Sequence, residues 1–148
     1  RSPYATRPWQ HVLEPLSGYL QLGAELFSRT NALRNESFNL GPEPDVNKTV
    51  EELLNEMKKY WELVNWKVDL PKDTKMKEAG LLKLSCDKAN NYLSWYTTLD
   101  FKTTIEFTVV WYKEFYSSEA KKSISDLTLK QINKYCEVAK AKKLRWTL

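Results

Sequence analysis

The segment ahead of the first predicted helix brings together residue types that bind anions. Residues 5–18 read ATRPWQHVLEPLSG and place Arg7, Trp9, Gln10 and His11 on an irregular stretch directly before that helix. Free N–H groups and the positive end of a helix dipole favour negative charge, and the planar fork of Arg matches phosphate oxygens. The structural alternative is that Arg7 pairs with a neighbouring acid and Trp9 fills the core.

The rest of the sequence contains no recognisable catalytic or metal-binding pattern. The only imidazole is that of His11, and the two cysteines, Cys86 and Cys136, lack metal-ligand spacing. The glycine-rich phosphate motifs, H-E-x-x-H and G-x-S-x-G are all missing. Four acids alternate with the apolar stripe of the second predicted helix and are expected to face solvent: Glu51, Glu52, Glu56 and Glu62. We therefore predict no catalytic residue and no metal site in this chain.

Composition indicates one globular domain over residues 1–148, with an aromatic content of 13% that predicts a ring-rich core. The net charge of +4 is local, because residues 121–148 hold 8 Lys+Arg and 2 acids. Without a nucleic-acid-binding motif, this excess predicts a solvated terminal helix and no nucleic-acid partner. No apolar run approaches the roughly 18–20 residues of a membrane span, so no membrane partner is expected. The cysteine pair is typical of cytosolic thiols.

Apolar periodicity predicts the elements that would position these side chains. Helices are expected over about 14–29, 49–61, 100–116 and 128–139. Thr49 with Glu52, and Thr128 with Gln131, have the spacing of helix-capping boxes. In the first helix one apolar face is expected to be buried, formed by Leu16, Tyr19, Leu20, Gly23, Leu26 and Phe27.

Short apolar or alternating runs predict strands over 37–40, 66–70 and, less regularly, 81–84. Residues 87–93 fit one or two helical turns. The expected fold class is α/β, with mixed α and β elements: about four helices with three or four short strands.

Several strings, in order along the chain, resemble the CDP-glucose 4,6-dehydratases, which are extended short-chain dehydrogenase/reductase enzymes. The most specific is ATRPWQHVLEPLSGYL from residue 5, preceded by Arg1 and Pro3. The others are FNLGP at 38–42, KEAGLLKL at 77–84, DKANNYLSW at 87–95, TLDFKTTIEFTVVWYKEFY at 98–116 and TLKQINKY at 128–135. The resemblance covers essentially the whole chain.

The resemblance implies the C-terminal substrate-binding lobe of an extended Rossmann-type dehydratase. Such an enzyme is a lyase of deoxysugar and O-antigen (lipopolysaccharide) biosynthesis that uses NAD to convert CDP-glucose to CDP-4-keto-6-deoxyglucose. The N-terminal Rossmann half, with NAD and the catalytic Tyr and Lys, would lie outside this fragment, which starts at Arg1 without Met. We expect the intact protein to be a cytoplasmic homodimer and the fragment alone to be inactive.

The resemblance also implies the residues that contact the substrate, which would be CDP-glucose or a related nucleotide-sugar. Arg7 matches the Arg that clamps the diphosphate, and Arg1 and Ser2 match a strand passing the base. Glu78 matches an acid near the ribose and phosphates, and Lys77 stands where a His is common. Trp9 is expected to pack beneath the phosphate site, with His11 as a hydrogen-bonding strand residue.

A different class of function remains open at this point. The chain could be a stand-alone nucleotide-sugar or protein-binding module whose terminal helix and aromatic surface serve a partner. A lobe separated from its Rossmann half would expose apolar surface, so either self-association or binding of the hydrophobic dye ANS is expected.

Overall fold

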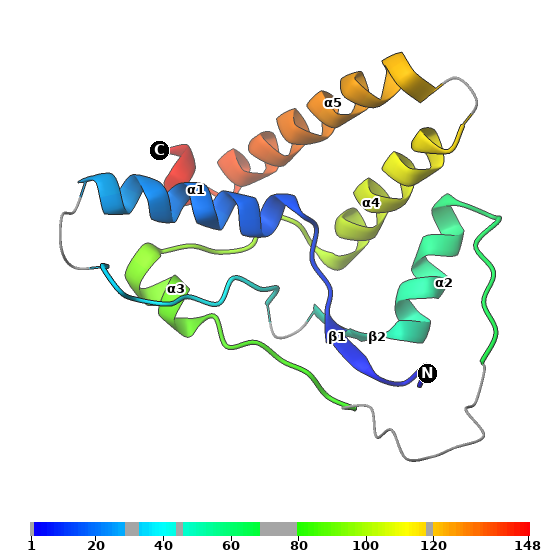
Figure 1. The fold of residues 1–148 in the computed structure, drawn as a ribbon, viewed down its shortest axis with the longest axis horizontal. Helices are drawn as coiled ribbons and strands as arrows, with labels where there is room; N and C mark the ends of the chain where they lie inside the picture. Colours follow the sequence, from blue (N-terminus) through cyan, green and yellow to red (C-terminus); the bar gives the residue numbers. More distant parts are fainter. Residues whose placement is uncertain (1, 29–32, 44–45, 69–79, 118–119) are drawn as a thin grey trace.

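The computed structural model describes residues 2–28, 33–43, 46–68, 80–117 and 120–148. These residues form a mostly helical structure with one small sheet (Figure 1). The helices are α1 (Leu13–Ser28), α2 (Val50–Tyr60), α3 (Asp87–Leu93), α4 (Phe101–Phe115) and α5 (Ala120–Ala141), followed by the 3-10 turn η2 (Arg145–Thr147). The strands are β1 (Thr6–Pro8) and β2 (Asn47–Thr49). The mixed fold class predicted from the sequence is confirmed.

The two strands form an antiparallel pair that ties the N-terminal segment to the start of α2. Thr6 lies opposite Thr49 and Pro8 opposite Asn47. Thr49 then caps α2, because its hydroxyl accepts from the Glu52 N–H and the Glu52 carboxylate accepts from the Thr49 N–H. This reciprocal capping box confirms the sequence prediction and fixes where β2 ends.

The helices pack around two clusters of buried side chains. In Figure 1, α4 and α5 lie side by side, α2 packs against α4, and α1 crosses the other end of α5. One cluster lies around α3, with Leu93 and Trp95 fully buried. The other joins α4 to α5 through Phe107 and Tyr135, with Leu99 between them. The connection between α3 and α4 therefore passes through the centre of the molecule.

The burial of α1 is the reverse of what its apolar periodicity predicts. Its buried side chains are mainly polar or charged: Glu14, Ser17, Gln21 and Glu25, together with Gly18. The expected core face is exposed, with Leu20 77% and Phe27 92% accessible. The helix itself was correctly predicted, but its apolar face is exposed and not buried in the described part of the chain.

The predicted strands over 37–40, 66–70 and 81–84 are wrong wherever the structure describes them, since residues 37–40, 66–68 and 81–84 have no regular structure. A strand needs a hydrogen-bonded neighbour. Residues 37–40 are held by hydrogen bonds between side chains and backbone instead: Gln10 Nε2 donates to the Leu40 carbonyl, and Asn39 Nδ2 donates to the Ser85 carbonyl. Residues 69 and 70 lie outside the described residues.

Two further sequence predictions need correction. Thr128 does not begin the last helix, because α5 starts at Ala120 and the Thr128 hydroxyl lies inside it, donating to the Ile124 carbonyl. Glu56 does not face solvent. It is buried against α4 and pairs with Lys59, Oε2 to Nζ 2.6 Å. The short helix at 87–93 is present as α3.

Candidate functional site

The strand pairing places two cations on one face of the sheet. Arg7 of β1 lies directly opposite Lys48 of β2. Directly opposed side chains of an antiparallel pair lie on the same face, with Cβ atoms about 4.5–5.5 Å apart, and like charges in that position repel. Arg7 is half-buried, and its Nη1 donates to the Thr6 carbonyl at 2.7 Å. Arg7 and Lys48 are therefore neighbouring candidates for contact with an anion.

Lys48 is a candidate that the sequence prediction missed. Its ammonium group lies 3.2 Å from Glu52 Oε1, which anchors it at the start of α2. Its carbonyl accepts from Trp9 Nε1 at 2.9 Å, so the Trp9 ring is tied to the same strand. A three-residue polar strand has too few residues to show a period of two. Only the capping box at Thr49 marks its end in the sequence.

The N-terminus of α1 does not supply the free N–H donors that the sequence prediction assumed. The Leu13 N–H donates to His11 Nδ1 at 3.3 Å, and the Glu14 N–H donates to the His11 carbonyl at 3.0 Å. Pro15 has no N–H, and the Leu16 N–H donates to the Val12 carbonyl. The helix start is therefore already satisfied, and an anion beside β1 would depend on side chains.

His11 has a structural role in this arrangement. It follows β1 rather than lying in a strand, and it is buried edge-on against Phe107 with ring centroids 5.7 Å apart. The expected hydrogen-bonding role is confirmed by its bond from Leu13. Burial lowers the pKa of the imidazole, which keeps the ring neutral at physiological pH and able to accept through Nδ1.

Glu14 anchors the start of α1 to the centre of the molecule. Its carboxylate is 1% exposed and accepts from the Thr98 and Leu99 N–H groups and from the Tyr135 hydroxyl, at 2.7–3.1 Å. Burial raises the pKa of this carboxyl, although these hydrogen bonds and the charge of Lys142 oppose the rise. The network holds the segment that leads to β1 in place.

The other predicted contact residues are only partly described. Ser2 is exposed ahead of β1, whereas Arg1, Lys77 and Glu78 lie outside the described residues. Gly80 lies against β1, since its carbonyl accepts from the Thr6 N–H at 2.9 Å. The structure thus places Arg7, Lys48 and Trp9 together and leaves the predicted roles of Arg1, Ser2, Lys77 and Glu78 as predictions.

The surface beside this site is shallow. A hollow of about 10 Å³ adjoins Pro8, Asn47 and Lys83, which is room for one water molecule. Within the described ranges, no group of three His, Cys, Asp or Glu side chains is placed to hold a metal ion. None of the described helices combines the length and apolar composition that a bilayer span requires.

Comparison with known proteins shows what the chain is related to. No protein-family model matches it. It is 38% identical over 132 residues to the CDP-glucose 4,6-dehydratase of Salmonella typhimurium, a match that covers 85% of this chain and 36% of that protein. The chain therefore spans about a third of the length of this relative. Its sequence is related to part of a CDP-glucose 4,6-dehydratase, which confirms the resemblance predicted from the strings above.

Proposed function

We propose that this chain is the C-terminal, nucleotide-sugar-binding part of a CDP-glucose 4,6-dehydratase. The whole enzyme would convert CDP-glucose to CDP-4-keto-6-deoxyglucose through NAD-dependent oxidation, loss of water and return of the hydride. The observation that supports this most strongly is the 38% identity over 85% of the chain. The CDP-glucose substrate, or a related nucleotide-sugar, would be bound in part by Arg7.

The Arg7 and Lys48 pair supports the binding half of the proposal. A nucleotide-sugar contains a diphosphate with two negative charges. A guanidinium and an ammonium on adjacent strands supply a fork and a point charge for such a group. The shallow surface beside β1 cannot enclose a nucleotide-sugar, so further walls would come from the rest of the protein.

The described residues do not fit NAD. A dinucleotide site needs a glycine-rich turn between a parallel strand and a helix, whereas the described sheet has two antiparallel strands and the sequence lacks the glycine motif. NAD and the catalytic groups would therefore belong to the remaining part of the enzyme, and this fragment alone would be inactive.

The two free thiols agree with the proposed cytoplasmic location. The intact enzyme would act as a homodimer.

A chimera tests the proposal. In it, this chain replaces the matched 132 residues of the Salmonella relative. We expect calorimetric titration of the folded chimera to show binding of CDP-glucose and CDP but not of free glucose. A chimera that melts cooperatively but binds neither nucleotide would contradict the proposal and favour a protein-binding module.

A further inference from the structure

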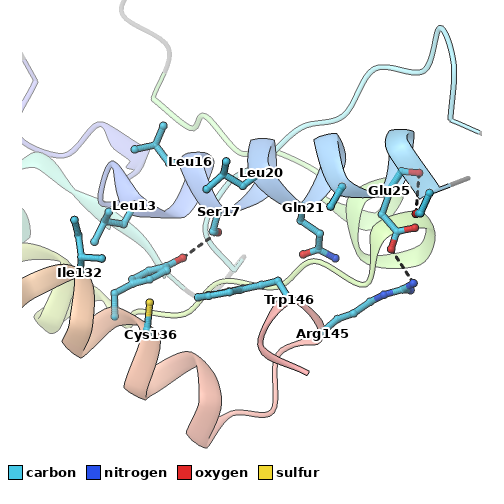
Figure 2. A pocket seen from close by; sticks show the side chains of 13 residues that line it. Leu13, Leu16, Ser17, Leu20, Gln21, Glu25, Ile132, Cys136, Arg145 and Trp146 are labelled. Carbon is cyan, nitrogen blue, oxygen red and sulfur yellow. Dashed lines mark hydrogen bonds and ion pairs between the residues drawn. The ribbon is translucent and has the colours of Figure 1, made fainter.

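A groove of about 650 Å³ lies between α1, α5 and η2 (Figure 2). We call it the α1/α5 groove. Its lining is mainly apolar, with the polar Ser17, Gln21 and Tyr135 along its floor; the apolar walls include Leu13, Leu16, Leu20, Ile132 and Trp146. The size and character of the groove match sites that enclose a ligand or a few side chains.

Gln21 and Trp146, which line the groove, each have a buried polar atom without a hydrogen-bond partner in the described structure. Gln21 is 5% exposed and points from α1 toward Trp146 in Figure 2. Its Nε2 donates to the Leu93 carbonyl, which fixes the orientation of the amide and leaves Oε1 without a donor. The indole Nε1 of Trp146 is likewise buried without an acceptor. Both atoms have less than 1 Å² of accessible surface, so an occupant would contact the apolar walls of the groove and not these two atoms.

The ends and edges of the groove limit what can occupy it. At one end Glu25 and Arg145 form an ion pair of 2.7 Å, which satisfies the charge there (Figure 2). The apolar wall continues outward over the exposed side chains of Leu16 and Leu20. The charged side chains that line the groove, Glu25 and Arg145, pair with each other, whereas the mainly apolar walls would bury an extended apolar surface.

We propose that the α1/α5 groove receives an apolar segment of polypeptide from the remaining part of the full-length dehydratase, an inference that rests on the proposed function. The segment would lie along the mainly apolar walls of the groove. Its apolar side chains would cover Leu16 and Leu20. The source of the segment follows from length, because this chain matches only 36% of its relative and most of the enzyme lies elsewhere.

Cys136 provides a direct readout, because it lines the groove and is half-buried in the 148-residue chain. The experiment compares maleimide labelling of Cys136, followed by peptide mass spectrometry, in the isolated chain and in the chimera. We expect labelling to be slower in the chimera by about tenfold or more. Equal labelling rates in both proteins would overturn the proposal. In the isolated chain, labelling of Cys136 could also slow as the protein concentration rises. If it slowed to the rate seen in the chimera, a second copy of the chain would be the occupant and the proposal would be overturned.

Two variants separate occupancy from folding. Leu20→Lys changes an exposed side chain and should restore Cys136 labelling in the chimera, whereas Leu129→Lys, exposed on α5 away from the groove, should not. CDP-glucose titration of the same chimera tests the proposed function separately. Binding of CDP-glucose with an unprotected Cys136 would overturn the groove proposal alone.

Discussion

At the scale of single residues, the strand register places Arg7 opposite Lys48, a neighbour that the sequence does not reveal. Arg7 could be selected from the sequence because it precedes Trp9 and His11 directly ahead of a predicted helix, whereas no sequence pattern marks Lys48. The two meet because β1 and β2 pair antiparallel. The N–H groups at the start of α1, which the sequence analysis also invoked, are occupied by His11 and Val12. An anion bound beside β1 would therefore depend on side chains.

Removing Arg7 is expected to weaken nucleotide binding. Loss of a charge-assisted contact costs about 1.5–3 kcal/mol, or roughly tenfold to a hundredfold in affinity. In the chimera, Arg7→Ala should reduce the affinity for CDP-glucose and CDP by this factor, and Arg7→Lys by less, because Lys cannot make a bidentate contact. Calorimetry measures both. Lys134→Ala, on the exposed surface of α5, is the matched control. Unchanged CDP affinity in Arg7→Ala would return Arg7 to a structural role.

Glu14 predicts a specific pH dependence of stability. Burial raises the pKa of Glu14 in the folded protein above its ordinary value of 4.5. The folded state therefore binds the proton more tightly than the unfolded state does. Its contribution to stability is complete below the unfolded pKa and is lost as the pH rises through the folded pKa. Urea unfolding of Glu14→Gln should show a flatter dependence of unfolding free energy on pH above 4.5 than the parent chain. The same slope in both proteins would contradict the assignment.

Truncating Glu14 to Ala should lower the free energy of unfolding far more than neutralising it by Glu14→Gln. Glu14→Ala leaves the Thr98 and Leu99 N–H groups and the Tyr135 hydroxyl buried with fewer acceptors. We expect a loss of about 3 kcal/mol or more in unfolding free energy at neutral pH. Glu137→Ala, at an exposed position on α5, serves as the control in the same urea titrations. A loss no larger than that of the control would show that the network is not needed for stability.

At the scale of elements, the helices could be predicted from the sequence and the strands could not. Apolar periodicity and caps are local, so α1, α2 and α4 were predicted close to their observed bounds. Strands depend on a partner that the sequence does not specify. The run at 37–40 looked like a strand yet forms no ladder, while the polar β2 does because Arg7 and its neighbours pair with it. The start of α5 was missed because Thr128 has cap chemistry but uses its hydroxyl within the helix.

The prediction at this scale concerns the end of β2. Thr49→Ala removes the side-chain acceptor at the start of α2, which should lower unfolding free energy by about 1 kcal/mol. The control is Lys58→Ala, which changes an exposed residue in the same helix and should stay within about 0.5 kcal/mol. Urea titration monitored by circular dichroism measures both. Equal effects of the two substitutions would contradict the capping assignment.

At the scale of the whole molecule, α1 buries its polar side chains and exposes an apolar face, which is typical of an interaction surface. The polar side chains of α1 face the core and form hydrogen bonds with Leu93, Thr98 and Tyr135, whereas Leu20 and Phe27 are exposed. Sequence periodicity located this apolar face but could not say which side of the helix the chain itself would bury. Under the proposed function, the surface that covers this face would lie in the rest of the enzyme.

The isolated chain should consequently associate with itself or bind the hydrophobic dye ANS. The double variant Leu20→Lys with Phe27→Lys replaces two exposed apolar side chains of α1 and should reduce the dye signal and the sedimentation coefficient. Leu129→Lys, which is exposed on α5, should have less effect. A clean monomer without a dye response would count against a missing covering surface.

Turnover by the chimera is the most direct test of the central claim. The 148-residue chain and the folded chimera are each incubated with CDP-glucose and NAD, and the mass of the nucleotide-sugar product is measured by mass spectrometry. We predict that the chimera yields a product lighter by one water molecule and that the isolated chain yields none. Conversion by the isolated chain, or no conversion by a chimera that is folded and binds NAD, would contradict the assignment of this chain as the nucleotide-sugar-binding part of a CDP-glucose 4,6-dehydratase.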